Sequence, residues 1–151
     1  MNDASAYMAE ALRLAEHSFK LGEVPVGAVV VVDNRIVGRG FNRREHLNSA
    51  LEHAELMALK EASELLGRWR LSDATVYSTL EPCLMCAGAL LHARIKNLVF
   101  GARDPKFGAI VSLFRLSEDA RLNHRFSFEE GVMAQDCAEL LRRFFANLRE
   151  K

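Results

Sequence analysis

The sequence predicts an α/β protein, a three-layer α/β/α sandwich with a central mixed sheet of about five strands. Short apolar runs rich in β-branched residues alternate with longer segments of helical period. At 151 residues, with 50% hydrophobic and 26% charged side chains, the chain is long enough to bury a substantial core and has an ordinary globular composition. No linker or repeat interrupts it, so residues 1–151 are expected to form one domain.

The first part of the chain is predicted to form a helix and a β-hairpin. Residues 4–21 place apolar side chains at helical spacing, and Gly22 suits the end of that helix. The run 24–32 is almost continuously apolar, which is typical of a strand covered on both faces. A tight turn at 33–34 would lead into a second strand over 36–41.

A loop and a second helix are expected next. Residues 40–52 lack periodicity, and the helix is predicted to begin at His53 and end near Leu66, before Gly67. Its inner face is predicted to carry Leu56, Leu59, Ala62 and Leu66.

The rest of the chain is predicted to supply three strands and two helices. The strands are expected over 74–79, 98–101 and 126–128, and the helices over 83–93 and 134–149. Residues 111–116 fit neither pattern clearly.

Charge and cysteine content restrict the setting. Twenty basic and twenty acidic side chains cancel, so any attraction to a nucleic acid must come from a local cluster. Residues 1–10 lack the pattern of a secretory leader, and no apolar run approaches the roughly 20 residues that span a bilayer. We therefore expect a cytoplasmic protein without a membrane partner, whose cysteines serve metal binding or catalysis more readily than disulfides.

Two short motifs about thirty positions apart predict a metal site. The first contains His53 and Glu55, and the second contains Cys83 and Cys86 at the start of a predicted helix. Thiolates there would face unpaired backbone N–H groups, which lower the pKa of a thiol. His53, Cys83 and Cys86 supply three ligands, which leaves one position of a tetrahedral zinc ion open for water, as in catalytic sites.

Glu55 is the candidate general base. Zinc lowers the pKa of a bound water from about 15.7 toward about 7, so a neighbouring carboxylate can take its proton at neutral pH. The same carboxylate could then protonate a ring nitrogen and the departing ammonia, because these are successive transfers around one centre.

The cysteines also fit two other kinds of site. A Cys-x-x-Cys pair that opens a helix also suits a thioredoxin-like redox site. A structural zinc site would need a fourth ligand, and the remaining cysteine, Cys137, lies in the apolar run of the last helix, where core packing is expected. The paired motifs favour the catalytic zinc site.

The His-x-Glu and Pro-Cys-x-x-Cys motifs resemble the zinc site of nucleoside and nucleobase deaminases. Further segments across nearly the whole chain resemble bacterial tRNA-specific adenosine deaminases. These segments are 22–28, Asn42, 79–89, 100–106, 123–125 and 144–149.

The resemblance implies a cytidine-deaminase-like fold and a hydrolytic reaction. Adenosine at the wobble position of a tRNA anticodon would be converted to inosine, with one zinc ion per subunit and the enzyme acting as a homodimer whose subunits both contribute near the active sites. Val26, Asn42 and Ala54 would contact the flipped base. Taken without the family, Asn42 is more simply a loop residue that caps its own turn.

The resemblance also implies a set of tRNA contacts. Phe144, Phe145 and Arg149 combine rings and charge on the last helix, where Arg142 and Arg143 add to the basic character and one Phe is expected in the core. Asp104, Lys106, Asn123 and His124 are expected to meet the RNA, along with Arg103 and Arg125. Two positions depart from the family pattern, Glu52 and Val111, and both bear on substrate detail.

The sequence leaves three rival functions open. One is a deaminase of a free nucleobase or nucleoside of the guanine or cytosine type. The second is a thiol–disulfide protein that uses the Cys83–Cys86 pair. The third is a zinc module that binds RNA without catalysis.

Overall fold

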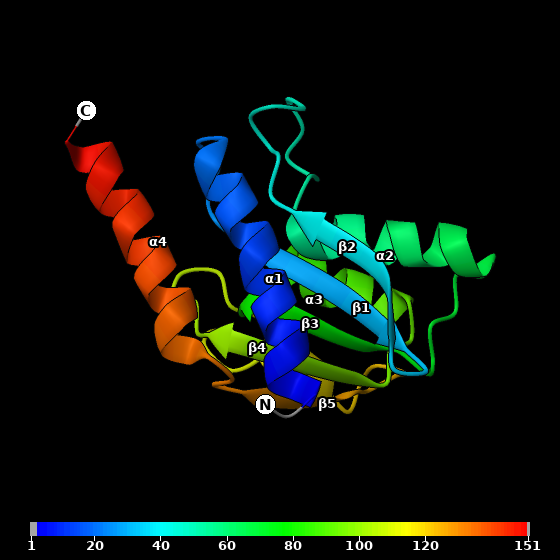
Figure 1. The fold of residues 1–151 in the computed structure, drawn as a ribbon. Helices are drawn as coiled ribbons and strands as arrows, with labels where there is room; N and C mark the ends of the chain where they lie inside the picture. The colour runs from blue at the N-terminus through cyan, green and yellow to red at the C-terminus, as the bar shows by residue number, and fades with distance from the viewer. Residues whose placement is uncertain (1–2, 151) are drawn as a thin grey trace.

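Five strands form one mixed sheet in a computed structural model that describes residues 3–150 (Figure 1). Their order in the sheet is β2–β1–β3–β4–β5. The strands are β1 (Gly27–Val32), β2 (Arg35–Phe41), β3 (Thr75–Leu80), β4 (Asn97–Ala102) and β5 (Ser127–Glu130). β1 is antiparallel to β2 and β3, whereas β4 is parallel to β3 and β5, so the sheet is mixed as predicted. The described range excludes residue 151 and residues 1–2. The latter are the first two residues of the segment 1–10, in which no leader pattern is expected.

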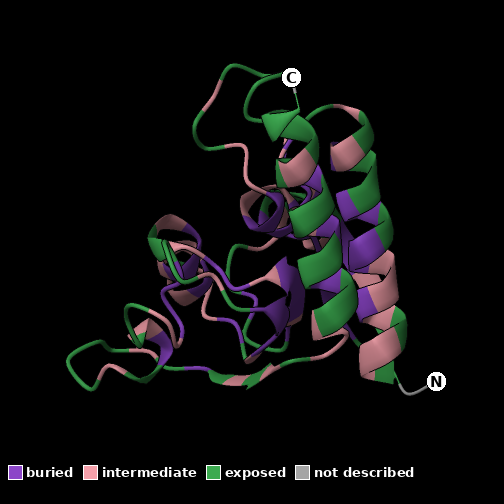
Figure 2. Ribbon diagram, turned by 90° about the vertical axis from the view of Figure 1, so that its left-hand side faces the viewer, coloured by how far each residue is buried: buried purple, intermediate pink, exposed green. Residues whose placement is uncertain are grey.

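Helices cover both faces of the sheet, which confirms the three-layer prediction (Figure 1). One layer contains α1 (Asp3–Lys20) and α4 (Ala134–Arg149), whose buried sides face inward in Figure 2. The other layer contains α2 (Ala54–Leu66) and α3 (Leu84–His92). A short 3₁₀ helix, η1 (Leu116–Glu118), follows in the long connection to β5. None of the helices within residues 3–150 is both long and apolar enough to cross a membrane.

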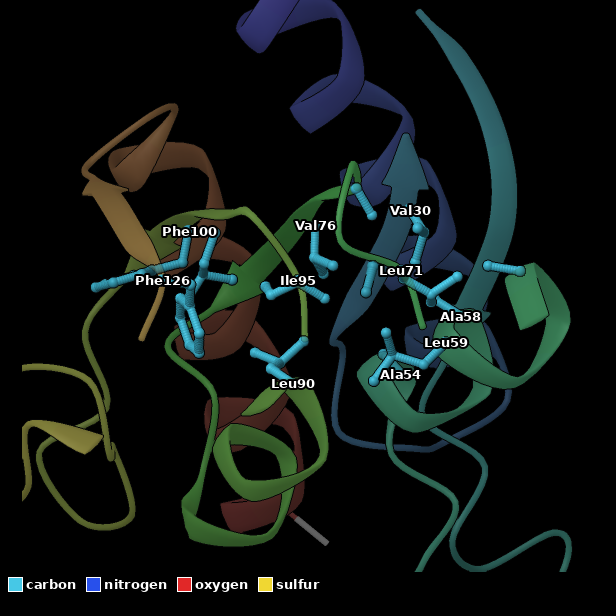
Figure 3. Close-up of a cluster of buried hydrophobic side chains, with 14 of the residues drawn as sticks. Val30, Ala54, Ala58, Leu59, Leu71, Val76, Leu90, Ile95, Phe100 and Phe126 are labelled. Carbon is cyan, nitrogen blue, oxygen red and sulfur yellow. The ribbon is translucent and has the colours of Figure 1, made fainter. Parts of the chain in front are cut away.

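Two hydrophobic clusters, one on each face of the sheet, hold the layers together. The cluster beneath α2 and α3 packs Val30 and Val76 of the strands against Ala58 and Leu90 of the helices (Figure 3). The cluster beneath α1 and α4 includes Cys137, which is 2% exposed. The prediction that Cys137 is a core residue is therefore confirmed.

Two glycines of β2 determine how closely α2 lies to the sheet. A Cβ atom added to Gly38 would stand 2.1 Å from the carbonyl oxygen of Ala58, and one added to Gly40 would stand 2.1 Å from that of Ala54. Neither distance is sterically possible, so glycine at both positions lets the alanine-lined face of α2 rest directly on the strand backbone. The first turn of α2 is thereby fixed relative to the sheet.

The turn predictions hold better than the exact boundaries. Gly22 and Gly67 have the positive φ values, 79° and 69°, that suit helix ends, and Asp33 and Asn34 form the left-handed turn of the hairpin. β1 begins only at Gly27, since Pro25 has no backbone N–H group to donate to a neighbouring strand. β5 likewise begins after Phe126, which is buried, and 111–116 contains no strand.

The predicted inner face of α2 was partly wrong. Leu56 is only half-buried, and the buried positions are instead Ala54, Glu55, Ala58, Leu59 and Ala62. The close approach of helix and strand explains the difference, since the contact line takes alanines rather than leucines.

Candidate metal centre

Three possible metal ligands meet where the N-termini of α2 and α3 converge. His53 is the N-cap of α2, Cys83 is the N-cap of α3, and Cys86 lies in the first turn of α3. The Nδ1 atom of His53 lies 3.6 Å from Sγ of Cys83 and 3.4 Å from Sγ of Cys86. All three ligand atoms lie within 4.8 Å of one another. The grouping expected from the two motifs is confirmed.

The spacing and chemistry of the trio fit zinc. Zinc–sulfur and zinc–nitrogen bond lengths of about 2.3 and 2.0–2.1 Å at a tetrahedral angle place sulfur and nitrogen about 3.6 Å apart. The observed sulfur–nitrogen distances of 3.4 and 3.6 Å match that separation. Two thiolates and one imidazole are also a ligand set that zinc prefers. Cys86 is fully buried while His53 and Cys83 are partly exposed, so the open side of the trio faces outward.

The two thiols differ in acidity. The hydrogen bond with Cys86 lowers the pKa of Cys83 to about 4, helped by His53 and by the backbone N–H of Cys86. The same interaction raises the pKa of Cys86, and burial raises it further. The lowering expected from the helix terminus is seen at Cys83, whereas at Cys86 the neighbouring sulfur and burial oppose it, because two adjacent sulfurs do not ionise together.

Glu55 is a buried carboxyl group next to the trio. It lies in the first turn of α2 and is 3% exposed. Burial raises its pKa to about 7, and the charge of Cys83 acts in the same direction, while a backbone N–H group and His53 act in the opposite direction. A carboxyl group with such a pKa can both accept and release a proton near neutral pH, as a proton shuttle must.

Asn42 links three segments around the site. Its side-chain Oδ1 accepts a hydrogen bond from the backbone N–H of Ala54 at 2.9 Å, so it caps the first turn of α2. Its backbone N–H donates to the carbonyl of Val26, and its carbonyl accepts from the Ser18 hydroxyl. Asn42 therefore caps a neighbouring helix rather than its own turn, and Val26, Asn42 and Ala54 lie together as the resemblance implied.

Glu81 is a structural residue that the sequence did not single out. Its carboxylate is 1% exposed and accepts hydrogen bonds from four backbone N–H groups and one hydroxyl, all in the loop that follows β4. The donors are the N–H groups of Asp104, Ile110, Val111 and Ser112 and the hydroxyl of Ser112. Burial favours the neutral form, yet these donors hold the pKa of Glu81 below its usual value. The available signal was an acidic residue directly before Pro82 and the two cysteines of the motif.

The predicted RNA contacts of the connecting loops lie in two places. Oδ1 of Asp104 accepts from the N–H groups of Lys106 and Phe107, so that carboxylate stabilises its own turn, while the Lys106 side chain is exposed. Asn123 and His124 line a groove of about 490 Å³ beside α3, where His124 Nε2 lies 2.9 Å from the carbonyl of Ile95.

The last helix carries one buried and one exposed phenylalanine. Phe144 is 7% exposed, with its ring edge-on to that of Phe19 of α1, which confirms that one of the pair belongs to the core. Phe145 is 43% exposed, and Arg149 is exposed one turn further on. Of the predicted pair of stacking rings, only that of Phe145 is open in this structure.

Comparison with known proteins places this geometry in a family. Residues 2–149 match the model of the MafB19-like deaminases. A tRNA-specific adenosine deaminase of Streptococcus pyogenes serotype M1 is 46% identical over the whole chain and 88% of its own length. The chain belongs to the tRNA-specific adenosine deaminase family.

Solved structures agree with that assignment. A structure from a study of A-to-I editing by tRNA:A34 deaminases at the wobble position of transfer RNA matches this deaminase with a TM-score of 0.86 and 41% identity, over 89% of this chain and 98% of the other. A guanine deaminase from Nitrosomonas europaea matches with a TM-score of 0.81 but 22% identity, over 94% of this chain and 84% of the other. The second match shows a shared fold alone.

Proposed function

We propose that this protein hydrolyses adenosine to inosine at the wobble position of a tRNA anticodon. The observation that carries the proposal is the buried Glu55 beside a His53–Cys83–Cys86 trio of zinc-like spacing. Net chemistry exchanges the 6-amino group of adenine for the oxygen of water and releases ammonia. The names and substrates of the relatives support adenosine in tRNA as the substrate.

His53, Cys83 and Cys86 would hold one zinc ion per subunit. When bound, zinc acts as a Lewis acid that lowers the pKa of water and so makes a nucleophile available at neutral pH. Glu55 accepts the first proton of the attacking water and delivers it to a ring nitrogen of the adenine, then takes the second proton from the hydroxyl group added at C6 and gives it to the amino group, which leaves as ammonia. Burial suits Glu55 to these transfers because it brings the pKa of the carboxyl group to about 7.

Val26, Asn42 and Ala54 form the proposed base-binding wall. Their backbones are joined by the hydrogen bonds of Asn42, which places them beside the first turn of α2. The Nδ2 group of Asn42 is a donor suited to the edge of a flipped purine. A base in an anticodon loop is unpaired, so it leaves the stack at low cost.

Exposed basic and aromatic groups would hold the RNA around that wall. Phe145 offers a ring for stacking, and Arg149 and Lys106 offer charge for phosphates. We assign Asp104 and Phe144 to the same interaction surface, with the ring of Phe144 acting as support for that of Phe145, 5.4 Å away between centroids. Asn123 and His124 line the groove beside α3, and we propose that they meet the RNA from the subunit interface formed there.

We further propose that two copies associate through the face around α3. Leu84 and Leu122 line the groove of about 490 Å³, and both are exposed, at 54% and 38%. Phe107, Leu113 and Phe114 of the adjoining loop are also exposed. Exposed apolar groups of this number favour a protein interface, and a second copy is the occupant that the family resemblance implies. Phe114→Glu with Leu122→Glu should convert a dimer to a monomer in analytical ultracentrifugation, whereas a monomeric wild type would contradict this assignment.

The cytoplasm is the proposed compartment. All three cysteines, Cys83, Cys86 and Cys137, are free thiols in the structure, which suits a reducing environment in which tRNA is also present.

Anticodon stem-loops with adenine or cytosine at the wobble position test the proposed function. Purified zinc-loaded protein should release ammonia and form inosine from the adenine stem-loop, and leave the cytosine stem-loop and free guanine unchanged. Guanine deamination without inosine formation would favour the nucleobase deaminase, and binding without ammonia release would favour a noncatalytic RNA module.

A further inference from the structure

The segment 43–52, the rim loop, rises from the end of β2 and leads into the first turn of α2 (Figure 1). Most of its side chains are exposed. Its base is closed by a hydrogen bond from the N–H of Arg43 to the carbonyl of Glu52, 3.1 Å long. The loop therefore stands at the edge of the metal centre, directly before His53.

A single buried carboxylate fastens the outer part of this loop. Glu23 lies in the connection between α1 and β1 and is 3% exposed. Its oxygens accept hydrogen bonds from the backbone N–H groups of Glu45, at 3.2 Å, and His46, at 2.8 Å. The Nδ1 atom of His46 lies 2.7 Å from the same carboxylate. The chemical steps assigned to Glu55 make no use of Glu23.

Burying a carboxylate is unfavourable unless charge-assisted hydrogen bonds compensate for the lost hydration. Burial alone would raise the pKa of Glu23, but the donors of the rim loop outweigh it and lower the pKa. The ionised carboxylate therefore binds the loop in one position.

Arg44 is the rim-loop cation nearest to this tether in the chain. It is exposed, it directly precedes Glu45, whose N–H group Glu23 holds, and it lies two positions after Asn42 of the proposed base-binding wall. Its carbonyl accepts a hydrogen bond from the N–H of Ser49 at 3.0 Å, which fixes its backbone within the loop. A cation on a tethered loop next to a site that receives a flipped nucleotide is suited to the phosphate of that nucleotide.

We infer that Glu23 is a positioning residue for RNA binding, which holds the rim loop so that Arg44 meets a phosphate beside the target adenine. The inference rests on the proposed function, since it names how the same site receives its RNA substrate. Loss of the tether should weaken the encounter with RNA and leave the chemical step nearly intact.

Steady-state kinetics with the adenine stem-loop test this inference in Glu23→Ala, Glu23→Gln and Arg44→Gln. Glu23→Ala loses charge-assisted hydrogen bonds to the rim loop, and Arg44→Gln loses one phosphate contact. We expect the KM of each variant to increase on the order of tenfold. The kcat of each should stay within about threefold of wild type, because Glu55 and the trio are untouched. Glu23→Gln keeps one acceptor oxygen, so its KM should rise less than that of Glu23→Ala.

The double variant Glu23→Ala/Arg44→Gln separates a tether from a general loss of stability. If Glu23 acts through Arg44, the double variant should have a KM within about twofold of Glu23→Ala, whereas independent effects would multiply. Arg44→Gln should also make the slope of log affinity against log salt concentration shallower, by about the amount that one phosphate contact contributes.

Amide hydrogen exchange and a matched carboxylate variant complete the test. In Glu23→Ala, exchange at Glu45 and His46 should accelerate, while the amide of Ala54, held by Asn42, should stay protected. Glu10→Ala removes a different paired carboxylate, which lies on the surface of α1 next to Arg13 and Arg39, and should leave KM unchanged.

The possible outcomes distinguish this inference from the proposed function. Inosine formation by the wild type establishes the function independently of Glu23. Three results would overturn the inference that Glu23 positions Arg44. These are an unchanged KM in Glu23→Ala, a loss confined to kcat, and KM effects that multiply in the double variant.

Discussion

The behaviour of Glu55 follows from its place rather than from its residue type. It is held in the first turn of α2 with 3% exposure, where burial raises the pKa of its carboxyl group to about 7. An exposed glutamate ionises near pH 4.3 and would be a weak proton donor at neutral pH. The close contact between α2 and β2, which fixes the first turn of α2, therefore bears on the proton transfer proposed for Glu55.

Glu55→Gln should abolish turnover without loss of the metal. The amide keeps the shape of the side chain but cannot carry a proton, so the rate should fall by at least about 10²–10⁴-fold. Inosine formation and zinc content of the purified variant are the two measurements. Activity close to that of the wild type would remove Glu55 from the proton-transfer role.

Glu81→Gln should lower stability. The amide nitrogen of glutamine cannot accept the N–H groups that converge on the native carboxylate, so the free energy of unfolding should fall by about 2–4 kcal/mol in urea titrations. Glu130→Gln, which removes a surface ion pair with Arg103, is the matched control and should cost less than about 1 kcal/mol. Equal losses of unfolding free energy in the two variants would show that the buried hydrogen bonds of Glu81 stabilise the fold no more than a surface ion pair does.

At the scale of elements, the contact between α2 and β2 joins fold and site. Gly40→Ala would place a methyl group against the carbonyl of Ala54, one residue from His53 and Glu55. The helix must shift, so we expect a destabilisation of about 1–3 kcal/mol and a loss of activity larger than that destabilisation explains. Arg39→Ala, between the two glycines, should have little effect on either measurement. A fully active Gly40→Ala variant would show that the position of α2 is not critical.

The elements that could be predicted are those with a local signal. The helices, the hairpin and their glycine ends follow from periodicity and turn chemistry, and the metal trio follows from two compact motifs. Leu56 was misplaced because the pattern cannot show how closely a helix approaches its sheet. Glu23 and Glu81 were missed as anchors because their partners are backbone N–H groups of distant loops, which have no sequence pattern.

For the molecule as a whole, the buried Glu23 links stability to pH. The folded-state pKa of Glu23 lies below its usual value of 4.5, so its stabilisation is complete above that value and is lost as the pH falls through the folded pKa. The difference in unfolding free energy between wild type and Glu23→Gln should therefore be larger at about pH 5.5 than at about pH 3.5. Denaturant titrations at the two pH values measure it, and a difference that grows toward acid would contradict the sign.

The whole architecture brings two distant segments of the chain together at one point, where α2 and α3 begin. Zinc K-edge X-ray absorption of the purified protein tests that claim most directly. We expect one zinc per chain with two sulfur ligands at about 2.3 Å and nitrogen or oxygen ligands at about 2.0–2.1 Å, and loss of this shell in Cys83→Ala. A protein without zinc, or a zinc shell that contains no sulfur, would contradict it.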